Sequence, residues 1–375
     1  PRFPWRGFML DSCRHIQSVG FIEQLIDQLA YYKMNRLHWH LTEDQAWRLE
    51  ISKYPRLTEI AAWRNTGEQR YGGFFTKDQV RHIIEYGRQR YVTVYPEIEM
   101  PGHATAGLYA YPELTCSGKP FPAGENGLHY YCCDKKGAGP QIFCAGRKET
   151  FRFLENVLIE VFDLFDTPFI HIGGDERRRG IWSECSRCQQ VIRQHGLRDE
   201  DHLQNWFMDQ IASFVRTNDR RTIAWAEDLK DGIPENQLVQ GWHEGESVKA
   251  TKMGFETINS DHSFTYLSYH WSEESKRQKP DGYGPILELE KVYSFDPIPD
   301  GLTNEQAARV IGSEAPIWTE RVPNDTTAYE YIFPRLLAFS EVIWSPQHAR
   351  QFSEFQPRLR DHIHRLKLMG VPCGE

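Results

Sequence analysis

The chain has 375 residues, a formal net charge of −8 and 13% aromatic residues, among them 11 Trp. A chain of this length can bury a core large enough for one α/β barrel. Because binding of nucleic acid requires clusters of basic side chains, the acidic balance argues against a nucleic-acid partner. The one short basic run, Arg177-Arg178-Arg179, is typical of a solvated turn. No stretch of about 18 apolar residues occurs, so no membrane-spanning helix is expected.

The tryptophan content exceeds what a core alone requires. Surplus Trp often lines sites for carbohydrates or other flat ligands, because the indole ring offers a large apolar face with a polar edge. Packing beneath the loops of a barrel is the alternative explanation for several of them.

The eight cysteines fall mainly into two groups. Cys116, Cys132, Cys133 and Cys144 share one stretch, and Cys185-x-x-Cys188 forms the second group. A single CxxC motif without a matching pair is weak evidence for zinc, so a local disulfide or free thiols are favoured and no metal is expected. Pro1 cannot be a translation start, so the missing signal peptide says little. We expect an exported protein, in a periplasmic, extracellular or lysosome-like compartment.

Short apolar segments alternate with segments of helical periodicity along the chain. The expected strands are 8–10, 36–41, 92–98, 169–172, 222–225, 238–242, 264–267 and 310–317. The expected helices are 21–33, 77–90, 149–165, 201–215, 247–253 and 304–309, with closing helices at 329–339 and 352–369. Eight strand–helix alternations predict a (β/α)8 TIM barrel rather than a doubly wound sheet. We expect a single domain over residues 1–375, with a long irregular loop at about 104–147.

The most informative segment is the expected strand 169–172 and the four residues that follow it. Gly173-Gly174 allows a tight turn, and two adjacent carboxylates, Asp175 and Glu176, come next. Neighbouring side chains cannot point the same way from a strand, so the two acids must serve different purposes. Two carboxylates in different environments are how a protein separates a proton donor from a helper.

The other strand ends also carry polar and aromatic residues. In a TIM barrel the active site lies at the carboxyl ends of the strands, so these residues are expected to converge. The segments concerned are 11–15, 38–45, 96–103, 225–228, 241–243, 266–269 and 318–320.

Four of these segments resemble those of the family 20 glycoside hydrolases, the β-N-acetylhexosaminidases. They are Arg6-Gly7-Phe8-Met9-Leu10-Asp11 with Arg14-His15, the segment His38-Trp39-His40, the segment Pro101-Gly102-His103, and the run from His171 to Glu176. The resemblance extends from Trp5 to about Trp344, nearly the whole chain.

The resemblance implies an exo-acting, retaining enzyme without cofactor or metal, in which the substrate's own acetamido oxygen attacks the anomeric carbon. Glu176 would act as general acid and then general base. Asp175 would stay ionised and hold the acetamido N–H, and Tyr266 would hydrogen-bond the acetamido oxygen. The implied partner is an oligosaccharide or glycoconjugate with a terminal β-linked GlcNAc, or alternatively GalNAc or 6-sulfo-GlcNAc.

The resemblance also assigns the residues that bind the sugar. Arg14 looks like the guanidinium that grips ring hydroxyls, a task suited to its forked donors. Trp318 and Glu320 are similar to a stacking wall and a hydroxyl acceptor. Trp225 and Trp242 are similar to the walls that enclose the acetamido methyl group, with core packing as the alternative for each.

Three departures from the family pattern affect the expectations. His103, with Glu43 or Glu99 as its partner, looks like a relay that orients Glu176, but the family commonly has Asp at both glutamate positions. A His that merely holds a loop is the alternative. Ser268 replaces a family Asp that reaches the sugar's C6 hydroxyl, so we expect the smaller side chain to leave room for a 6-substituent. Residues 271–286 do not align with the family's Trp on the aglycone side, so they suggest no leaving-group preference.

Two other classes of protein compete with this interpretation. His38 and His40 lie on the same face of a strand, as in barrel hydrolases that bind metal. A non-catalytic GlcNAc-binding barrel is the second alternative, although such a barrel would be expected to lose Asp175 or Glu176.

Overall fold

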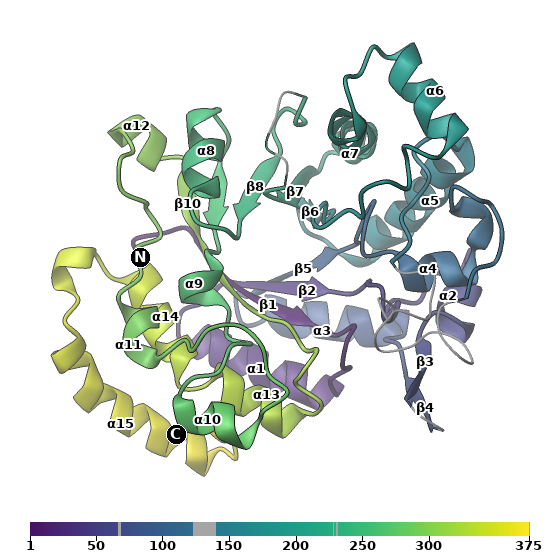
Figure 1. Ribbon diagram of the computed structural model, residues 1–375. Helices are drawn as coiled ribbons and strands as arrows, with labels where there is room; N and C mark the ends of the chain where they lie inside the picture. Colours follow the sequence, from purple (N-terminus) through teal and green to yellow (C-terminus); the bar gives the residue numbers. More distant parts are fainter. Residues whose placement is uncertain (67–68, 123–139, 228, 230–231, 375) are drawn as a thin grey trace. The chain divides into compact units, whose positions relative to one another are not determined.

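The computed structural model describes residues 1–66, 69–122, 140–227, 229 and 232–374. In this part of the chain, eight parallel strands form a closed barrel in the order β1-β10-β9-β8-β7-β6-β5-β2, which confirms the predicted fold class (Figure 1). The barrel strands are β1 (Trp5–Asp11), β2 (Arg36–His40), β5 (Thr93–Glu97), β6 (Phe169–His171), β7 (Arg221–Trp225), β8 (Leu238–Gly241), β9 (Thr257–Asn259) and β10 (Val310–Ile317). A separate antiparallel hairpin consists of β3 (Trp63–Thr66) and β4 (Gln69–Gly72).

The helices arise from one-sided apolar patterns. In α1 (Val19–Tyr31) the side chains of Phe21, Ile22, Leu25, Ile26 and Leu29 are buried, and the hydroxyl of Ser18 accepts a hydrogen bond from Phe21 N–H at the start of the helix. The other long helices are α3 (Lys77–Arg88), α5 (Lys148–Leu164), α6 (Ser186–Gln194), α7 (Glu200–Thr217), α13 (Asp325–Ile332), α14 (Arg335–Trp344) and α15 (Phe352–Leu368). Short helices are α2 (Arg56–Glu59), α4 (Thr105–Ala110), α8 (Glu246–Lys252), α9 (His262–Thr265), α10 (Glu273–Gln278), α11 (Leu289–Tyr293), α12 (Asn304–Ala307), and the 3-10 turns η1 (Pro112–Leu114) and η2 (Gln347–Ala349).

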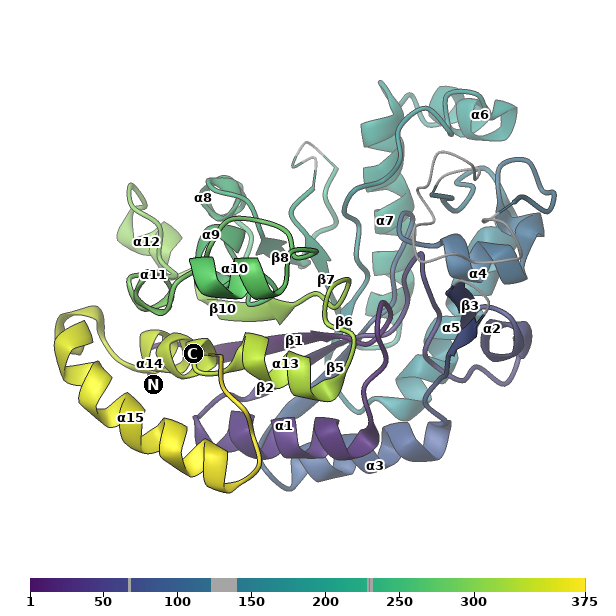
Figure 2. The same cartoon turned by 60° about the horizontal axis from the view of Figure 1, so that its bottom comes forward.

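The chain forms two compact units, which we describe separately. Unit 1 comprises residues 1–39, 85–94 and 239–375, and unit 2 comprises residues 40–84 and 95–238. In unit 1, β1 pairs with β10 over six residues, from Trp5 opposite Gly312 to Leu10 opposite Ile317, and the two strands lie side by side in Figure 2. In unit 2, β6 pairs with β7 and reaches β5 through His171 opposite Glu97.

The strand predicted at 264–267 is wrong. The seventh barrel strand is β9, three residues that begin at Thr257, and the apolar run from Phe264 follows it as part of the short helix α9. Asp261 explains the difference, since its carboxylate accepts a hydrogen bond from Ser263 N–H at 2.9 Å and thereby starts a helical turn. Aromatic and β-branched residues alone did not reveal that cap.

The predicted irregular loop at 104–147 contains two ordered elements, α4 and η1. Cys132 and Cys133, which belong to this loop, lie outside the described residues. The closing helix expected at 329–339 is two helices, α13 and α14, because Pro334 lacks the N–H that a continuous helix needs. Among the described residues, no helix combines the length and apolarity that crossing a bilayer requires.

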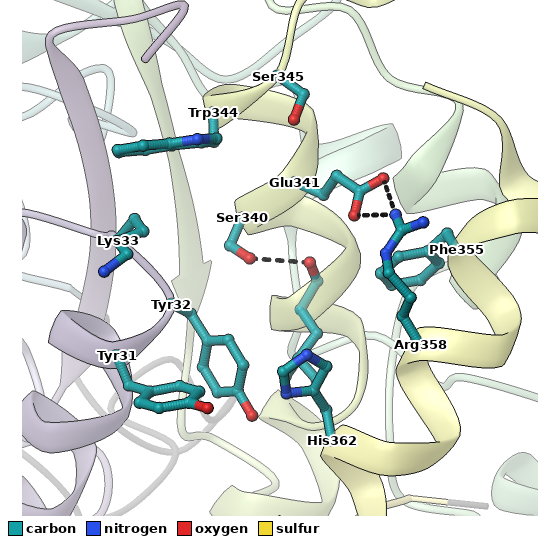
Figure 3. A pocket seen from close by; sticks show the side chains of 11 residues that line it. Tyr31, Tyr32, Lys33, Ser340, Glu341, Trp344, Ser345, Phe355, Arg358 and His362 are labelled. Atoms are coloured by element: carbon teal, nitrogen blue, oxygen red, sulfur yellow. Dashed lines mark hydrogen bonds and ion pairs between the residues drawn. The ribbon is translucent and has the colours of Figure 1, made fainter. Parts of the chain in front are cut away.

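Unit 1 contains a cavity of about 430 Å³ between the end of α1 and the helices α14 and α15 (Figure 3). Tyr31, Tyr32 and Lys33 line one side, and Glu341 and Arg358, joined by an ion pair at 2.7 Å, lie opposite. Lys33 precedes β2, so the cavity lies at the amino-terminal end of the strands. In TIM barrels that end serves stability rather than catalysis.

Candidate active site

The turn after β6 sets the directions of Asp175 and Glu176, which we call the acid pair. Gly173 and Gly174 have positive φ angles of 63° and 105°, and Glu176 follows with φ of 45°, an uncommon value for a residue with a side chain. A Cβ at Gly173 would lie 1.7 Å from a carboxylate oxygen of Glu99, so only glycine fits there. The backbone therefore turns sharply and projects two carboxylates from one strand end.

The two members of the acid pair differ in their surroundings. Asp175 is 8% exposed, and its Oδ1 is buried without a hydrogen-bond partner among the described residues. The side chain of Glu176 is 60% exposed. A buried acceptor without a partner is rare in proteins, and such an atom is open to a hydrogen-bond donor from water or from a ligand. The difference supports the predicted division of tasks.

His103 connects the acid pair to Glu43. Its Nδ1 lies 2.7 Å from Glu43 Oε1, and its Nε2 lies 3.5 Å from both Asp175 Oδ2 and Glu176 Oε2. Burial alone would lower the pKa of His103, but the carboxylates of Glu43 and Asp175 raise it well above its ordinary value. The arrangement favours a charged imidazolium. Of the two predicted partners for His103, the structure brings Glu43 into hydrogen-bond contact.

Glu99 has a different position. Its side chain is buried behind Gly173, and neither carboxylate oxygen has a hydrogen-bond partner among the described residues. Burial, followed by repulsion from Asp175, raises the pKa of Glu99 well above its ordinary value. Burial and the nearby Asp175 charge thus both disfavour the ionised form of Glu99.

Glu97 is a buried carboxylate that the sequence interpretation did not single out. It accepts a hydrogen bond from the indole N–H of Trp225 at 2.7 Å, and it contacts the imidazole rings of His40 and His171. Trp225 is 4% exposed, and burial together with the hydrogen bond to Glu97 fixes the position of its ring. The sequence did offer a signal for Glu97, because it is an acidic residue at a strand end, four residues before the motif Pro101-Gly102-His103.

The two histidines of the metal hypothesis each contact carboxylates. His38 Nδ1 lies 2.7 Å from Glu314, within unit 1. His40, in unit 2, contacts Glu97 and lies 3.2 Å from Glu43. Both rings are thus hydrogen-bonded to buried carboxylates.

Arg177 is not part of a solvated turn, contrary to expectation. It is 6% exposed, and its guanidinium donates to Gln204 at 2.6 Å and to Asp201 at 2.8 Å, both on α7. Gln204 also donates to the carbonyl of Gly174 at 2.6 Å. Helix α7 thus anchors the backbone on both sides of the acid pair.

In unit 1, Arg14 lies among polar and aromatic side chains that follow β1 and β10. Its guanidinium is 3.3 Å from Asp11 and 3.7 Å from Glu320, and it lies over the Trp318 ring at 5.1 Å. Asp11 is fully buried and also accepts the N–H of Thr319 at 2.9 Å. The structure therefore brings together Arg14, Trp318 and Glu320, three of the predicted sugar-binding residues of this unit, and fixes Arg14 through Asp11.

Tyr266 lies in a row of aromatic rings within unit 1. Its ring centroid is 6.3 Å from that of Trp318 and 5.9 Å from that of His262, and His262 is 6.5 Å from Trp242. The indole N–H of Trp242 is buried and has no hydrogen-bond partner among the described residues. The sequence analysis did not single out His262, which lies two residues before the segment predicted as a strand and begins helix α9.

Ser268 is 2% exposed, and its hydroxyl accepts a hydrogen bond from Tyr283 at 3.2 Å. The Tyr283 hydroxyl is also 3.5 Å from Glu320. Burial, followed by the charge of Glu320, raises the pKa of Tyr283 well above its ordinary value. Tyr283 therefore occupies part of the room expected beside Ser268. No pattern in the segment 271–286 distinguished it.

Asp44 was also overlooked beside Glu43. Its carboxylate accepts the N–H of Thr105 at 2.9 Å and lies 3.6 Å from His103 Nδ1. The sequence could have indicated Asp44, because Glu43 and Asp44 are adjacent acidic residues after the same strand. Its contacts fix the loop that carries His103.

A TIM barrel with paired carboxylates at a strand end is an arrangement that many glycoside hydrolases share. The sequence profile of "Glycosyl hydrolase family 20, catalytic domain" matches residues 3–347. The chain belongs to glycosyl hydrolase family 20, as the resemblance predicted.

Relatives and solved structures agree with the family assignment. The beta-hexosaminidase of Porphyromonas gingivalis is 40% identical over 99% of this chain and 47% of its own length. That of Akkermansia muciniphila is 31% identical over 96% of this chain and 72% of its own length. The GH20 exo beta-N-acetylglucosaminidase of Vibrio harveyi, solved with N-acetylglucosamine, has a TM-score of 0.88 and 30% identity, and the match covers all of this chain and 59% of that one. The chain thus spans about half the length of the P. gingivalis relative.

Proposed function

We propose that the protein is an exo-acting, retaining β-N-acetylhexosaminidase that releases terminal β-linked GlcNAc by substrate-assisted catalysis. The observation that carries the proposal is the difference in burial and surroundings between the two carboxyl groups of the acid pair, in a chain of family 20. Asp175 offers a buried acceptor without a partner, and Glu176 offers an exposed carboxyl beside His103. An N–H donor and a glycosidic oxygen are the substrate groups that these two carboxyls suit.

In the proposed reaction, the acetamido oxygen attacks C1 while Glu176 protonates the glycosidic oxygen. The C1–O bond breaks, the aglycone leaves as an alcohol, and an oxazolinium ion forms. Asp175 accepts the acetamido N–H and balances the positive charge that develops on this group. Glu176, now a carboxylate, takes a proton from water as the water opens the ring, which restores the acetamido group and the β configuration.

The sugar-binding roles in this proposal are those that the family resemblance implies, and the contacts of Arg14 in unit 1 support them. Arg14, fixed by Asp11, donates to ring hydroxyls, Glu320 accepts from them, and Trp318 offers its face to the sugar. By the family resemblance, we assign Tyr266 to the acetamido oxygen and both Trp225 and Trp242 to the acetamido methyl. The choice of GlcNAc is supported by the Vibrio harveyi and Streptomyces plicatus structures, which are described as complexes with GlcNAc.

The anomer formed first tests the proposed mechanism. Proton NMR of early hydrolysis of an aryl β-N-acetylglucosaminide is expected to show the β-anomer of GlcNAc before mutarotation. The matching aryl β-glucoside, which lacks the acetamido nucleophile, is expected to be hydrolysed at background rate. Initial release of the α-anomer, or comparable turnover of the glucoside, would exclude substrate assistance.

Replacement of His103 by glutamine is expected to move the alkaline limb of the pH profile to higher pH. A charged His103 stabilises the ionised form of Glu176, so its removal raises the pKa of the acid that must be protonated in the first step. The measurement is kcat/KM against pH for both proteins. As a control, His195, exposed at the end of α6, is replaced by glutamine and should leave the profile in place. An unchanged alkaline limb in the His103 variant would mean that this residue only holds its loop.

We further propose that the enzyme accepts GlcNAc with a 6-O-sulfate, as the Asp-to-Ser difference at Ser268 suggests. Tyr283 narrows the space beside Ser268, but its hydroxyl is a donor that a sulfate oxygen can accept. Tyr283→Phe is therefore expected to lower kcat/KM for a 6-sulfated aryl glycoside by about tenfold, the loss of one hydrogen bond to a charged group, with a smaller effect on the unsulfated one. Absence of turnover of the sulfated glycoside by the wild-type protein would refute the proposal.

A further inference from the structure

Four cysteine side chains meet in unit 2. They have no role in the proposed reaction, and two of them lie in the segment that follows the acid pair. They are Cys116, Cys144, Cys185 and Cys188, which we call the cysteine cluster. An antiparallel bridge between Thr115 and Phe143 brings together the two segments in which the first pair lies. The second pair is the CxxC motif at the start of α6. The motif that lacked a matching pair in the sequence thus has one in the fold.

The spacing of the sulfurs matches a single tetrahedral ion. Cys144 Sγ lies 3.6 Å from Cys188 Sγ and 3.8 Å from Cys185 Sγ, and Cys116 Sγ lies 3.8 Å from Cys188 Sγ. All four sulfurs lie within 4.8 Å of one another. Four thiolates at about 2.3 Å from a central Zn²⁺ form a tetrahedron whose edges are roughly 3.8 Å.

Other cysteine chemistry fits less well. A disulfide requires two sulfurs at about 2.05 Å and commits each to one partner, whereas Cys144 is nearly equidistant from both cysteines of the CxxC motif. All six cysteines in the described part of the chain are free thiols. An iron–sulfur cluster binds its thiolates to separate iron atoms, which spreads the sulfurs farther apart than these.

The surroundings suit a compact thiolate centre. Cys144 and Cys188 are fully buried, and Cys185 is 7% exposed. The N-terminus of α6, a nine-residue helix, directs its positive end toward Cys185 and Cys188, which favours thiolates. The side chains of Arg147 and Arg187 donate to the carbonyls of Thr115 and Cys116 and place two positive charges near the cluster. A Cβ at Gly146 would lie 2.4 Å from the backbone of Arg187, so the two segments pack closely.

We propose that the cysteine cluster is a structural zinc site, in which the four thiolates bind one Zn²⁺ and leave no position for substrate or water. The ion fastens the loop after β5 to the segment that follows the acid pair. Trp182 reinforces this link, because its indole N–H donates to Phe143 at 2.9 Å and its ring contacts Arg177. Zinc would thus stabilise the segment that holds Asp175 and Glu176 without taking part in the reaction.

Elemental analysis of the purified chain tests the proposal independently of its glycosidase activity. We expect one zinc per chain, retained during dialysis and released when a thiol-specific mercurial is added. Reconstitution with Co²⁺ is expected to give the intense visible absorption of a tetrahedral cobalt–thiolate centre. Stoichiometric iron, or disulfides linking these cysteines in peptide mass spectrometry of the non-reduced protein, would overturn the zinc assignment.

Two substitutions separate the zinc site from general thiol effects. Cys116 is the most exposed of the four ligands, so Cys116→Ser is more readily tolerated by the fold than a change at one of the buried cysteines. The zinc content and the melting temperature of this variant should both fall. Cys373→Ser changes a thiol of unit 1 outside the cluster and should leave both unchanged. Full zinc content in the Cys116 variant would refute the four-thiolate site. Because zinc content does not depend on turnover, an inactive protein with one zinc would count against the proposed function alone.

Discussion

Replacing Glu176 with glutamine is expected to lower kcat/KM for natural oligosaccharides by about 10²- to 10⁴-fold, the contribution typical of a general acid. The amide keeps the size of the side chain but cannot give a proton to the glycosidic oxygen. The backbone at Glu176 has φ of 45°, and glutamine tolerates this angle as well as glutamate does, so the fold should be retained. Hydrolysis rates and melting temperature are the measurements.

The dependence on the leaving group makes this prediction specific. A glycoside of an acidic phenol needs little protonation when its bond breaks. In the Glu176 variant, the rate of oxazolinium formation should therefore fall much less for this glycoside than for a natural disaccharide. Glu184→Gln, which changes an exposed glutamate of the same unit, is the control and should have wild-type rates. An equal loss for both leaving groups would show that Glu176 does not act as the proton donor.

Replacing Asp175 with asparagine is expected to lower kcat by at least about 10²-fold, the effect of removing one preorganised electrostatic contact in a buried site. Asparagine is nearly isosteric, but it carries no charge to balance the oxazolinium ion. Its amide N–H₂ would also face the acetamido N–H in one of its two orientations. Unlike the Glu176 variant, this one should lose the same factor for natural and aryl substrates.

Comparison of the two variants tests the division of tasks directly. Asp166→Asn, at an exposed position ahead of β6, serves as the control for loss of a negative charge in unit 2. If the Asp175 variant recovers on substrates with acidic phenols, Asp175 assists leaving-group departure, and the roles within the acid pair would have to be exchanged.

The barrel was predictable because seven of its strands lie in short segments rich in apolar, aromatic or β-branched residues, and such segments can be recognised locally. Strand β9 was not, because only one of its three residues, Ile258 between Thr257 and Asn259, is strongly apolar. The neighbouring run from Phe264 has the composition of a strand, but the Asp261 cap makes it helical. Composition therefore failed where a single local hydrogen bond decided the structure.

The predicted site residues come from strand ends, whose position in a barrel follows from the fold. The contacts that could not be predicted involve residues brought together by loops. Tyr283 reaches Ser268 from a segment without a recognisable motif, and Cys144 reaches the CxxC motif across a separation of more than forty residues. Sequence periodicity carries no information about such approaches between loops.

The turn at Gly173 limits how this protein could be redesigned. Because any side chain there would collide with the Glu99 carboxyl, variation at this glycine offers no route to altered chemistry. Glu99 itself is a better choice for an engineer, since its buried carboxyl interacts electrostatically with Asp175 and touches no substrate in our proposal. Shorter or amide side chains at this position provide a way to adjust the electrostatic field at Asp175 while the sugar contacts stay intact.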